Sequence, residues 1–290
     1  MHTSRPADAP ASAPTDLIMF WNLYEAAIER LDGDHARWEA QRELITAHRP
    51  RVLLTTEGWG WHRDGRKLFD DTRDALGMDG VLFPAKTECD LAVFWQPDIT
   101  RVETETVPPE LAAWHGHGAV TLRLPGHPEP LRFAVAHLDP FSPTNRLIES
   151  DRLRRYADPA GPPTILAMDA NSVPPGDPEP DWEQVPAHRR DDHLPPDSGT
   201  ADRTPLRRLL GRPGAPLFLD AGAHTADRAP TFGFHPPCEA PRRIDLILLA
   251  PALAESLAGY RALDDPLLTP GPDRPAASDH RPVTVRLRRR

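Results

Sequence analysis

The sequence predicts a single α/β or α+β domain with more than one layer of β-sheet. Short apolar runs bounded by turn residues recur along the chain, and some are separated by helical segments while others are separated by hairpin-length turns. No linker divides the 290 residues into two self-sufficient apolar halves, and hydrophobic residues make up 39% of the chain. We therefore expect one sizeable core built from both strands and helices.

The expected elements follow in chain order. Apolar runs at 17–22 and 52–57 each end in a polar residue and are expected to be buried strands. Helices are expected at 35–48, closed by Pro50, and at 66–76, stopped by Gly77. Closely spaced segments predict antiparallel strands at about 80–84, 90–95, 99–107, 118–124 and 131–138. A helix at 145–157 and strands at 164–168, 243–250 and 281–287 complete the expected elements.

Composition excludes several classes of protein. No run of 18 apolar residues exists, which excludes a membrane-spanning helix. The formal charge of −9 disfavours a broad, purely electrostatic nucleic-acid surface, although local arginines or a metal can still meet a phosphate. Residues 1–16 are polar and Pro/Ala-rich, so we expect a disordered N-terminal segment without a signal peptide. With only Cys89 and Cys238, a reduced cytoplasmic protein is the simplest interpretation.

Polar side chains recur where the apolar strands end. Carboxylates, amides and imidazoles delivered repeatedly to strand ends indicate one shared cleft, and buried carboxylates are costly unless they are paired or bound to metal. Glu57, Asp169 and Asp279, supported by Asn groups, suit a hard cation such as Mg²⁺ or Mn²⁺. The absence of a Cys cluster or a His-Glu-x-x-His helix argues against zinc. The residues in question are Asn22, Glu57, His137, Asp169, Asn171, Asp245, Asp279 and His280.

Taken singly, these residues also have purely structural interpretations. Asn22 could form a turn, Glu57 could be an exposed strand terminus, and Asp279 could be a turn acid. Asp245 lies in an apolar run but could pair with a neighbouring arginine. The ordered set of residues, rather than any one of them, carries the functional hypothesis.

That ordered set resembles the endonuclease/exonuclease/phosphatase superfamily, which has the deoxyribonuclease I-like fold. The resemblance runs from about residue 17 to residue 288 and implies a four-layer sandwich of two mostly antiparallel sheets flanked by helices. It also implies a catalytic domain over residues 17–290 that hydrolyses a phosphoester with a divalent metal. It rests on Trp21-Asn22, Thr56-Glu57, Ala136-His137-Leu138, Met168-Asp-Ala-Asn171, Arg243-Ile-Asp245 and Ser278-Asp-His280.

The resemblance also implies roles for individual residues. Glu57 matches the principal metal ligand, with Asn22 near metal and phosphate and Asp279 as an accessory metal or water contact. Asp169 and Asn171 match the pair that orients water and phosphate. Asp245 and His280 match a carboxylate–imidazole pair, and His137 resembles the second catalytic histidine of the nuclease branch. Whether Asp169 or His280 acts as the base stays open. The sequence lacks the signatures of apurinic endonucleases, inositol polyphosphate 5-phosphatases and tyrosyl-DNA phosphodiesterases.

Other residues have both a binding and a structural interpretation. Trp59, Trp61 and His62 could stack on a base or sugar, or pack their loop. Arg146 and Arg152 could hold phosphate from a helix. His115-Gly-His117 could bind metal but is more typical of a loop, and Asp191-Asp-His193 reads as a solvated loop. Residues 172–205 are expected to form a long irregular loop near the rim of the cleft.

Three functions are compatible with this sequence. The first is a divalent-metal-dependent phosphodiester hydrolase of the nuclease type, acting as a monomer on nucleic acid or another phosphoester. The second uses the same site on phosphomonoesters or lipid phosphodiesters. The third is a catalytically silent binding module, which the intact set of site residues argues against.

Overall fold

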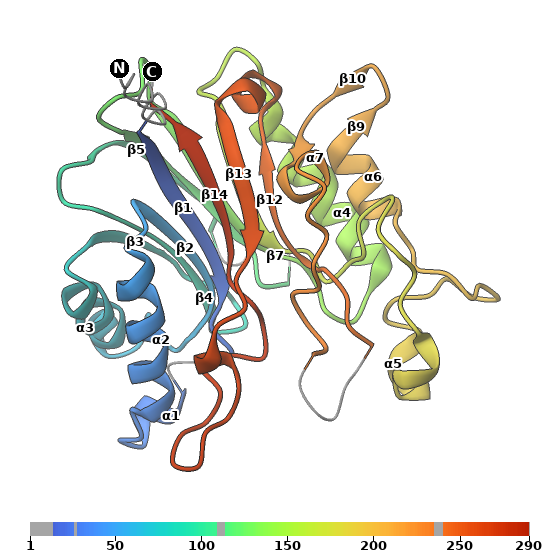
Figure 1. The fold of residues 1–290 in the computed structure, drawn as a ribbon, viewed down its shortest axis with the longest axis horizontal. Coiled ribbons are helices and arrows are strands. Elements are labelled where there is room, and N and C mark those ends of the chain that lie inside the picture. The colour runs from blue at the N-terminus through green and yellow to red at the C-terminus, as the bar shows by residue number, and fades with distance from the viewer. Residues whose placement is uncertain (1–13, 26–27, 109–113, 235–239, 290) are drawn as a thin grey trace, which may run out of the picture.

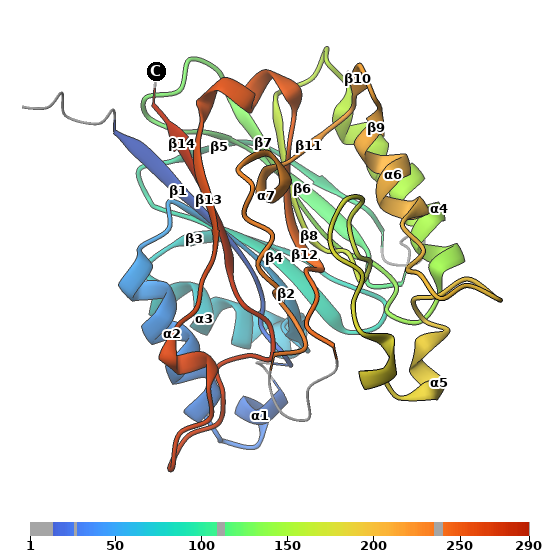
Figure 2. The ribbon, with the colours of Figure 1, turned by 45° about the vertical axis from the view of Figure 1, so that its right-hand side comes forward.

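Two six-stranded β-sheets form the centre of the computed structural model, which describes residues 14–25, 28–108, 114–234 and 240–289. Figures 1 and 2 show the sheets face to face with helices on their outer sides. The first sheet has the order β13-β14-β1-β2-β4-β3. Its strands are β1 (Thr15–Asn22), β2 (Val52–Trp59), β3 (Asp79–Phe83), β4 (Cys89–Trp95), β13 (Leu257–Ala262) and β14 (Val283–Arg288).

The second sheet has the order β11-β12-β8-β7-β6-β5. Each six-stranded sheet contains one parallel pair, β1 with β2 and β7 with β8, and its other pairs are antiparallel. The strands of the second sheet are β5 (Thr100–Thr106), β6 (His117–Arg123), β7 (Leu131–His137), β8 (Thr164–Asp169), β11 (Leu219–Asp220) and β12 (Asp245–Leu249). A small hairpin of β9 (Gly211–Arg212) and β10 (Ala215–Pro216) lies apart from both sheets.

The alternation of side chains along β1 explains the layers. Ile18 and Phe20 point into the core between the sheets, where Phe133 and Ile247 of the second sheet meet them. Met19 and Trp21 face the other way and pack under helices. Because both faces of the strand are covered, it reads as a continuous apolar run rather than an alternating one.

The helices form the two outer layers. Those outside the first sheet are α1 (Ile28–Leu31), α2 (Ala36–His48) and α3 (Lys67–Leu76). Those outside the second sheet are α4 (Pro143–Leu153) and α6 (Thr204–Leu210). The short α7 (Ala221–His224) contacts strands of both sheets and adds Ala221 to the core between them, while α5 (Ala187–Arg190) lies in a long connection. The expected four-layer α/β sandwich is therefore confirmed.

Most expected elements are present, with shifted ends. The strand expected at 243–250 begins only at Asp245, and the one expected at 281–287 begins at Val283. The first strand begins at Thr15, before the boundary expected at residue 16, while residues 1–13 lie outside the described residues. Strand β13 was not expected, because Gly259 interrupts its short apolar pattern.

The segment 172–205 is largely irregular, as expected. Within it lie only short helical turns at Trp182–Gln184 and α5, before α6 begins at Thr204. Its side chains Arg189 and His193 line the main cavity, so the segment does reach the rim. Among the helices of the described residues, none has the length and apolar character needed to cross a bilayer.

Candidate active site

A cavity of about 520 Å³ lies where the two sheets meet at one end of the sandwich. Strand register explains why the predicted residues gather there. His137 pairs with Asp169 across β7 and β8, and Asp169 pairs with Asp245 across β8 and β12, so three neighbouring strands deliver these residues side by side. Glu57, His137, Asp169, Asn171, Asp279 and His280 line the cavity.

A β-bulge in strand β2 sets the direction of the Glu57 side chain. The register between β2 and β4 shifts between Thr55 and Gly58, which is a β-bulge. Within it Glu57 takes a φ of 62°, a left-handed conformation that a residue with a side chain seldom adopts. The strand therefore does not end at Glu57, as the sequence suggested, but continues to Trp59. Such strain concentrates at functional sites, where the surrounding structure holds it in place.

Asn22 joins the two sheets behind the cavity. Its Nδ2 donates to Glu57 Oε1 and to Asp169 Oδ2, each at 2.9 Å. Its Oδ1 accepts from the backbone N–H of Tyr24 at 3.0 Å, which fixes the orientation of the amide. Asn22 was expected among the metal ligands. Its amide N–H groups order the two carboxylates that face the cavity, while its oxygen keeps a second lone pair, so its place among the metal ligands stays a prediction.

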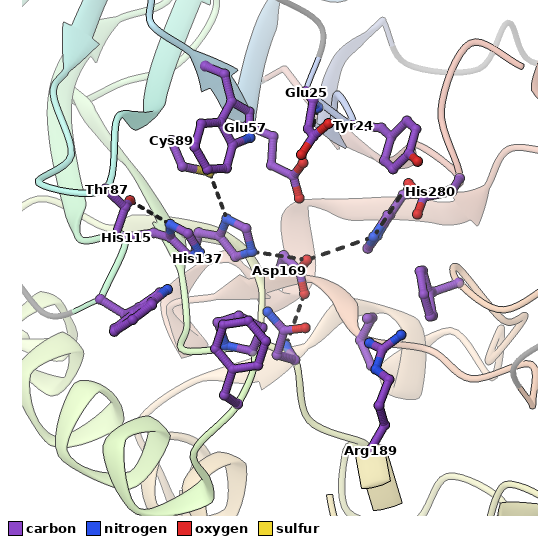
Figure 3. A pocket seen from close by; sticks show the side chains of 18 of the residues that line it. Tyr24, Glu25, Glu57, Thr87, Cys89, His115, His137, Asp169, Arg189 and His280 are labelled. Atoms are coloured by element: carbon purple, nitrogen blue, oxygen red, sulfur yellow. Dashed lines mark hydrogen bonds and ion pairs between the residues drawn. The ribbon is translucent and has the colours of Figure 1, made fainter. Parts of the chain in front are cut away.

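Asp169 lies between two imidazoles (Figure 3). Its Oδ2 is 3.4 Å from Nε2 of His137 and 4.0 Å from Nε2 of His280. Its Oδ1 accepts from the backbone N–H of Asn171, whose φ of 45° turns the chain sharply after β8. Burial alone would raise the pKa of Asp169, but the hydrogen bond and charge of His137 and the charge of His280 lower it below the usual range. Asp169 is thus a charged carboxylate at neutral pH.

Asp245 and His280 form the expected pair. His280 Nδ1 is 2.8 Å from Asp245 Oδ2, which leaves Nε2 directed toward Asp169. Burial raises the pKa of Asp245 to about 6. Burial alone would lower the pKa of His280, but the charges of Asp245 and Asp279 together raise it well above its usual value. The pair therefore holds its proton on the imidazole.

The oxygen atoms around Glu57 fit a hard divalent cation. One ligand atom each from Glu57, His137 and Asp169 lie within 4.8 Å of one another. Oδ1 of Asp279 is buried without a hydrogen-bond partner among the described residues, although its side chain remains 34% exposed. Carboxylate oxygens are the donors that Mg²⁺ and Mn²⁺ prefer. Glu57 and Asp169 could hold such an ion together with His137, while Asp279, whose Oδ1 lies 3.9 Å from His280 Nε2, lines the same cavity and stays a predicted further ligand.

Two arginines expected to hold phosphate lie elsewhere. Arg146 is only 1% exposed, and its guanidinium donates to the backbone carbonyls of Asp139 and Asp192. It therefore fastens the start of α4 to the long connection and does not line the cavity. Arg152 does not line the cavity either, because it lies at an exposed position further along α4.

The aromatic and imidazole side chains that follow the bulge, those of Trp59, Trp61 and His62, lie in three different environments. Trp59 lines the cavity, as a stacking residue would. Trp61 is fully buried and packs against Phe69 and Phe94 in the outer core, so its structural interpretation holds. His62 hydrogen-bonds the buried carboxylate of Asp90 through Nδ1 at 2.7 Å.

Several cavity residues were missed from the sequence. His115 lies in the connection before β6, as a loop residue should, but it is buried and its ring stacks on His137 with centroids 4.2 Å apart. His193 was taken for part of a solvated loop, yet it is 5% exposed and stacks on Trp182. Both histidines come from segments without periodicity, and their positions depend on long-range folding. Other missed lining residues are Tyr24, Cys89, Trp114, Phe141, Arg189, Phe232 and Arg242.

The buried His193 predicts a pH-dependent stability. Burial and the neighbouring charges of Arg242 and Arg146 lower the pKa of His193 to about 2, against about 6.5 in an unfolded chain. Below pH 6.5 the unfolded state therefore binds a proton that the folded state rejects, and stability is lost as pH falls. Between pH 7 and pH 5, the unfavourable protonation of this histidine should lower the free energy of unfolding by about 2 kcal/mol. Urea unfolding at both pH values should show a smaller loss for His193→Gln than for the wild type; equal losses would contradict this.

Known protein structures share this architecture. No family model and no curated protein sequence matches the chain. An endonuclease/exonuclease/phosphatase family protein from Bacteroides thetaiotaomicron aligns with a TM-score of 0.67 at 17% identity, covering 96% of this chain and 98% of that one. A mannosyl-6-phosphatase from the same organism aligns at 0.65 and 17% identity, covering 93% and 98%. The human Nocturnin catalytic domain aligns at 0.57 and 20% identity, covering 94% and 93%. The chain has the fold of the endonuclease/exonuclease/phosphatase proteins.

Proposed function

We propose that the protein is a divalent-metal-dependent phosphodiester hydrolase of the nuclease type. The observation that carries the proposal is the alignment of His137, Asp169 and Asp245 on adjacent strands, with Glu57 joined to Asp169 through Asn22. When bound, Mg²⁺ or Mn²⁺ would neutralise phosphate charge and polarise the phosphorus–oxygen bond. The catalytic domain would comprise residues 17–290, acting as a cytoplasmic monomer.

The side chains around Asp169 would supply the proton transfers. The charged carboxylate of Asp169 would orient a water molecule by accepting a hydrogen bond from it, although its lowered pKa makes it a weak acceptor of the proton itself. His280, held at Nδ1 by Asp245, would offer an N–H at Nε2 to a phosphate oxygen. His137, also directed toward Asp169 through Nε2, would protonate or hydrogen-bond the leaving oxygen. Asn171, whose Nδ2 donates to the carbonyl of Leu138, would complete the phosphate contact from a fixed position.

An aromatic pair at the rim supports a substrate that carries a planar base. Trp114 and Phe141 line the cavity with 38% and 60% exposed surface, and their rings meet edge to face at 5.9 Å. The buried carboxylate of Glu149 accepts from the backbone N–H groups of Trp114 and Asp139, and Asp139 in turn accepts from Phe141 N–H. The backbone that carries both exposed rings is therefore fixed, as expected of a stacking surface.

Removing these rings should weaken substrate binding. Trp114→Ala and Phe141→Ala should each raise KM for a nucleotide or oligonucleotide substrate by about 10-fold, because stacking of one base contributes about 1–3 kcal/mol. Turnover at saturation should change less. Ile148→Ala is the matched control, since Ile148 is an exposed apolar residue of α4 that does not line the cavity. Unchanged KM in both aromatic variants would rule out stacking at this rim.

The alternative within the same chemistry is a phosphomonoesterase or lipid phosphodiesterase. The cavity volume of about 520 Å³ lies in the range of small-molecule sites, which favours a compact substrate over a long duplex. A catalytically silent module is disfavoured by the paired acid and imidazole groups. The test is a screen with Mg²⁺ or Mn²⁺ on plasmid DNA, single-stranded DNA, RNA, phosphomonoesters and phospholipids. Cleavage of nucleic acid with Asp169→Asn inactive supports the proposal; cleavage of monoesters or phospholipids alone would select the alternative.

A further inference from the structure

A second group of potential metal ligands lies on the wall of the cavity opposite His280 (Figure 3). One ligand atom each from Cys89, His115 and His137 lie within 4.8 Å of one another. All three residues are buried, and all three line the cavity. This group differs in chemistry from the carboxylates near Glu57, because sulfur and imidazole nitrogen are the donors of softer cations.

The closest pair of these atoms already has a zinc-like separation. Sγ of Cys89 and Nδ1 of His137 are 3.7 Å apart. With metal–sulfur and metal–nitrogen bonds of about 2.3 Å and about 2.0–2.1 Å, a tetrahedral Zn²⁺ separates the two donors by about 3.6 Å. A cation could therefore enter between them with little movement of the side chains.

The ring of His115 stacks on that of His137 with centroids 4.2 Å apart and an interplanar angle of 20°, so the His115 ring must turn for its nitrogen to point at a cation bound by Cys89 and His137. Its Nδ1 lies 2.8 Å from the hydroxyl of Thr87, so one ring nitrogen is engaged by an orienting partner. Its neighbour His117 goes elsewhere: Gly116 takes a φ of 88°, and the His117 ring packs edge-on against Tyr156. His115 and His117 are separated by a single residue but face different surroundings, so a substitution at His117 is a matched control for one at His115.

We propose that Cys89, His115 and His137 form a binding site for a thiophilic divalent cation of the zinc type, whose occupation inhibits hydrolysis. As the metal–sulfur bond forms, the Cys89 thiol releases its proton to solvent, and a protonated His137 releases its Nδ1 proton as well, which frees the Nδ1 lone pair for the cation. The metal-bound ring keeps only its Nε2–H and cannot become an imidazolium, so it no longer acts as a general acid toward the leaving oxygen. The inhibitory part rests on the proposed function, whereas binding of the cation does not.

Cobalt binding tests the site without any substrate. One equivalent of Co²⁺ added to the purified full chain should produce a thiolate-to-cobalt charge-transfer band in the near ultraviolet, and Zn²⁺ should bleach it by displacement. The band should persist in Cys238→Ser, which removes the only other cysteine, and disappear in Cys89→Ala. No band in the wild type, or a band that survives Cys89→Ala, would overturn the proposal.

A comparison of His115→Asn with His117→Asn tests the cation site without any change at Cys89. His115→Asn should weaken Co²⁺ binding at least about 10-fold, while His117→Asn should leave it unchanged. This comparison decides the matter if Cys89→Ala does not fold, which circular dichroism would reveal. Equal affinities in the two histidine variants would exclude His115 as a ligand and overturn the site.

Inhibition is measured as the ratio of rates with and without Zn²⁺ at saturating Mg²⁺, within each variant. Addition of Zn²⁺ should lower the rate at least about 10-fold in the wild type and in His117→Asn, but should change the rate of His115→Asn little. Hydrolysis without a cobalt band would reject only this site. A cobalt band in a protein that hydrolyses no phosphoester would reject the proposed function and leave the cation site standing.

Discussion

Asp245→Asn should lower the maximal rate of hydrolysis by about 100-fold or more, because the pair of Asp245 and His280 acts on the substrate as one unit. Asparagine can still accept a hydrogen bond from Nδ1 of His280, but it carries no charge to stabilise an imidazolium. It can also donate and so impose the wrong tautomer on the ring. The metal concentration for half-maximal rate should stay nearly constant, because Asp245 does not line the cavity.

The pH profile separates this role from a merely structural one. Burial lowers the pKa of His280 and Asp245 raises it, so removing the charge of Asp245 should lower that pKa. The descending limb of the rate profile, where the imidazolium loses its proton, should move to lower pH. Asp16→Asn is the matched control, since Asp16 is another buried carboxylate, paired with His127 Nε2 at 2.9 Å and remote from the cavity. A rate loss of the same size in Asp16→Asn would contradict the assignment.

Glu57→Gln should act on metal affinity instead. The carboxylate of Glu57 faces the cavity from a bulge that fixes its direction, and its oxygens accept from Asn22 Nδ2 and Glu25 N–H. Glutamine keeps the shape but removes a negative charge from the oxygen ligands of a hard cation. We expect the metal concentration for half-maximal rate to rise about 10-fold or more, with much of the rate recovered at high metal.

Glu25→Gln is the matched control for that change. Glu25 also lines the cavity, but it contacts Glu57 through its backbone N–H rather than its carboxylate. It therefore changes the charge of the cavity by the same amount without removing the proposed ligand. Equal shifts in both variants would mean that the cation responds to the overall charge of the cavity rather than to Glu57 as a ligand.

The sequence predicts the site best where regular strands deliver the residues. His137, Asp169 and Asp245 could be anticipated because apolar runs place them at neighbouring strand ends, and the register then aligns them. His280 could be anticipated as a partner of Asp245 only through the ordered set of motifs. Its position depends on Ser278, whose hydroxyl donates to the carbonyl of Asn22 on a distant strand.

The residues that sequence reasoning misplaced depend on irregular backbone or long-range packing. Arg146 could not be distinguished from a phosphate ligand, because its carbonyl partner Asp192 lies 46 residues away. That Asn22 donates to both Glu57 and Asp169 could not be anticipated from the sequence, because these partners lie 35 and 147 residues away. The group of Cys89, His115 and His137 spans 48 residues of sequence, so the His115-Gly-His117 pattern alone pointed to metal and Cys89 could not be placed beside it.

Metal titrations of the wild type, Asp245→Asn and Glu57→Gln on one confirmed phosphoester substrate test the central claim most directly. The protein stripped of metal by a chelator should be inactive, and Mg²⁺ or Mn²⁺ should restore the rate along a saturating curve. Asp245→Asn should lower the plateau of that curve at an unchanged midpoint, and Glu57→Gln should mainly move the midpoint to higher metal concentration. A wild-type rate that is insensitive to the chelator, or identical plateaus and midpoints in all three proteins, would contradict a metal-dependent site built on Glu57 and the Asp245–His280 pair.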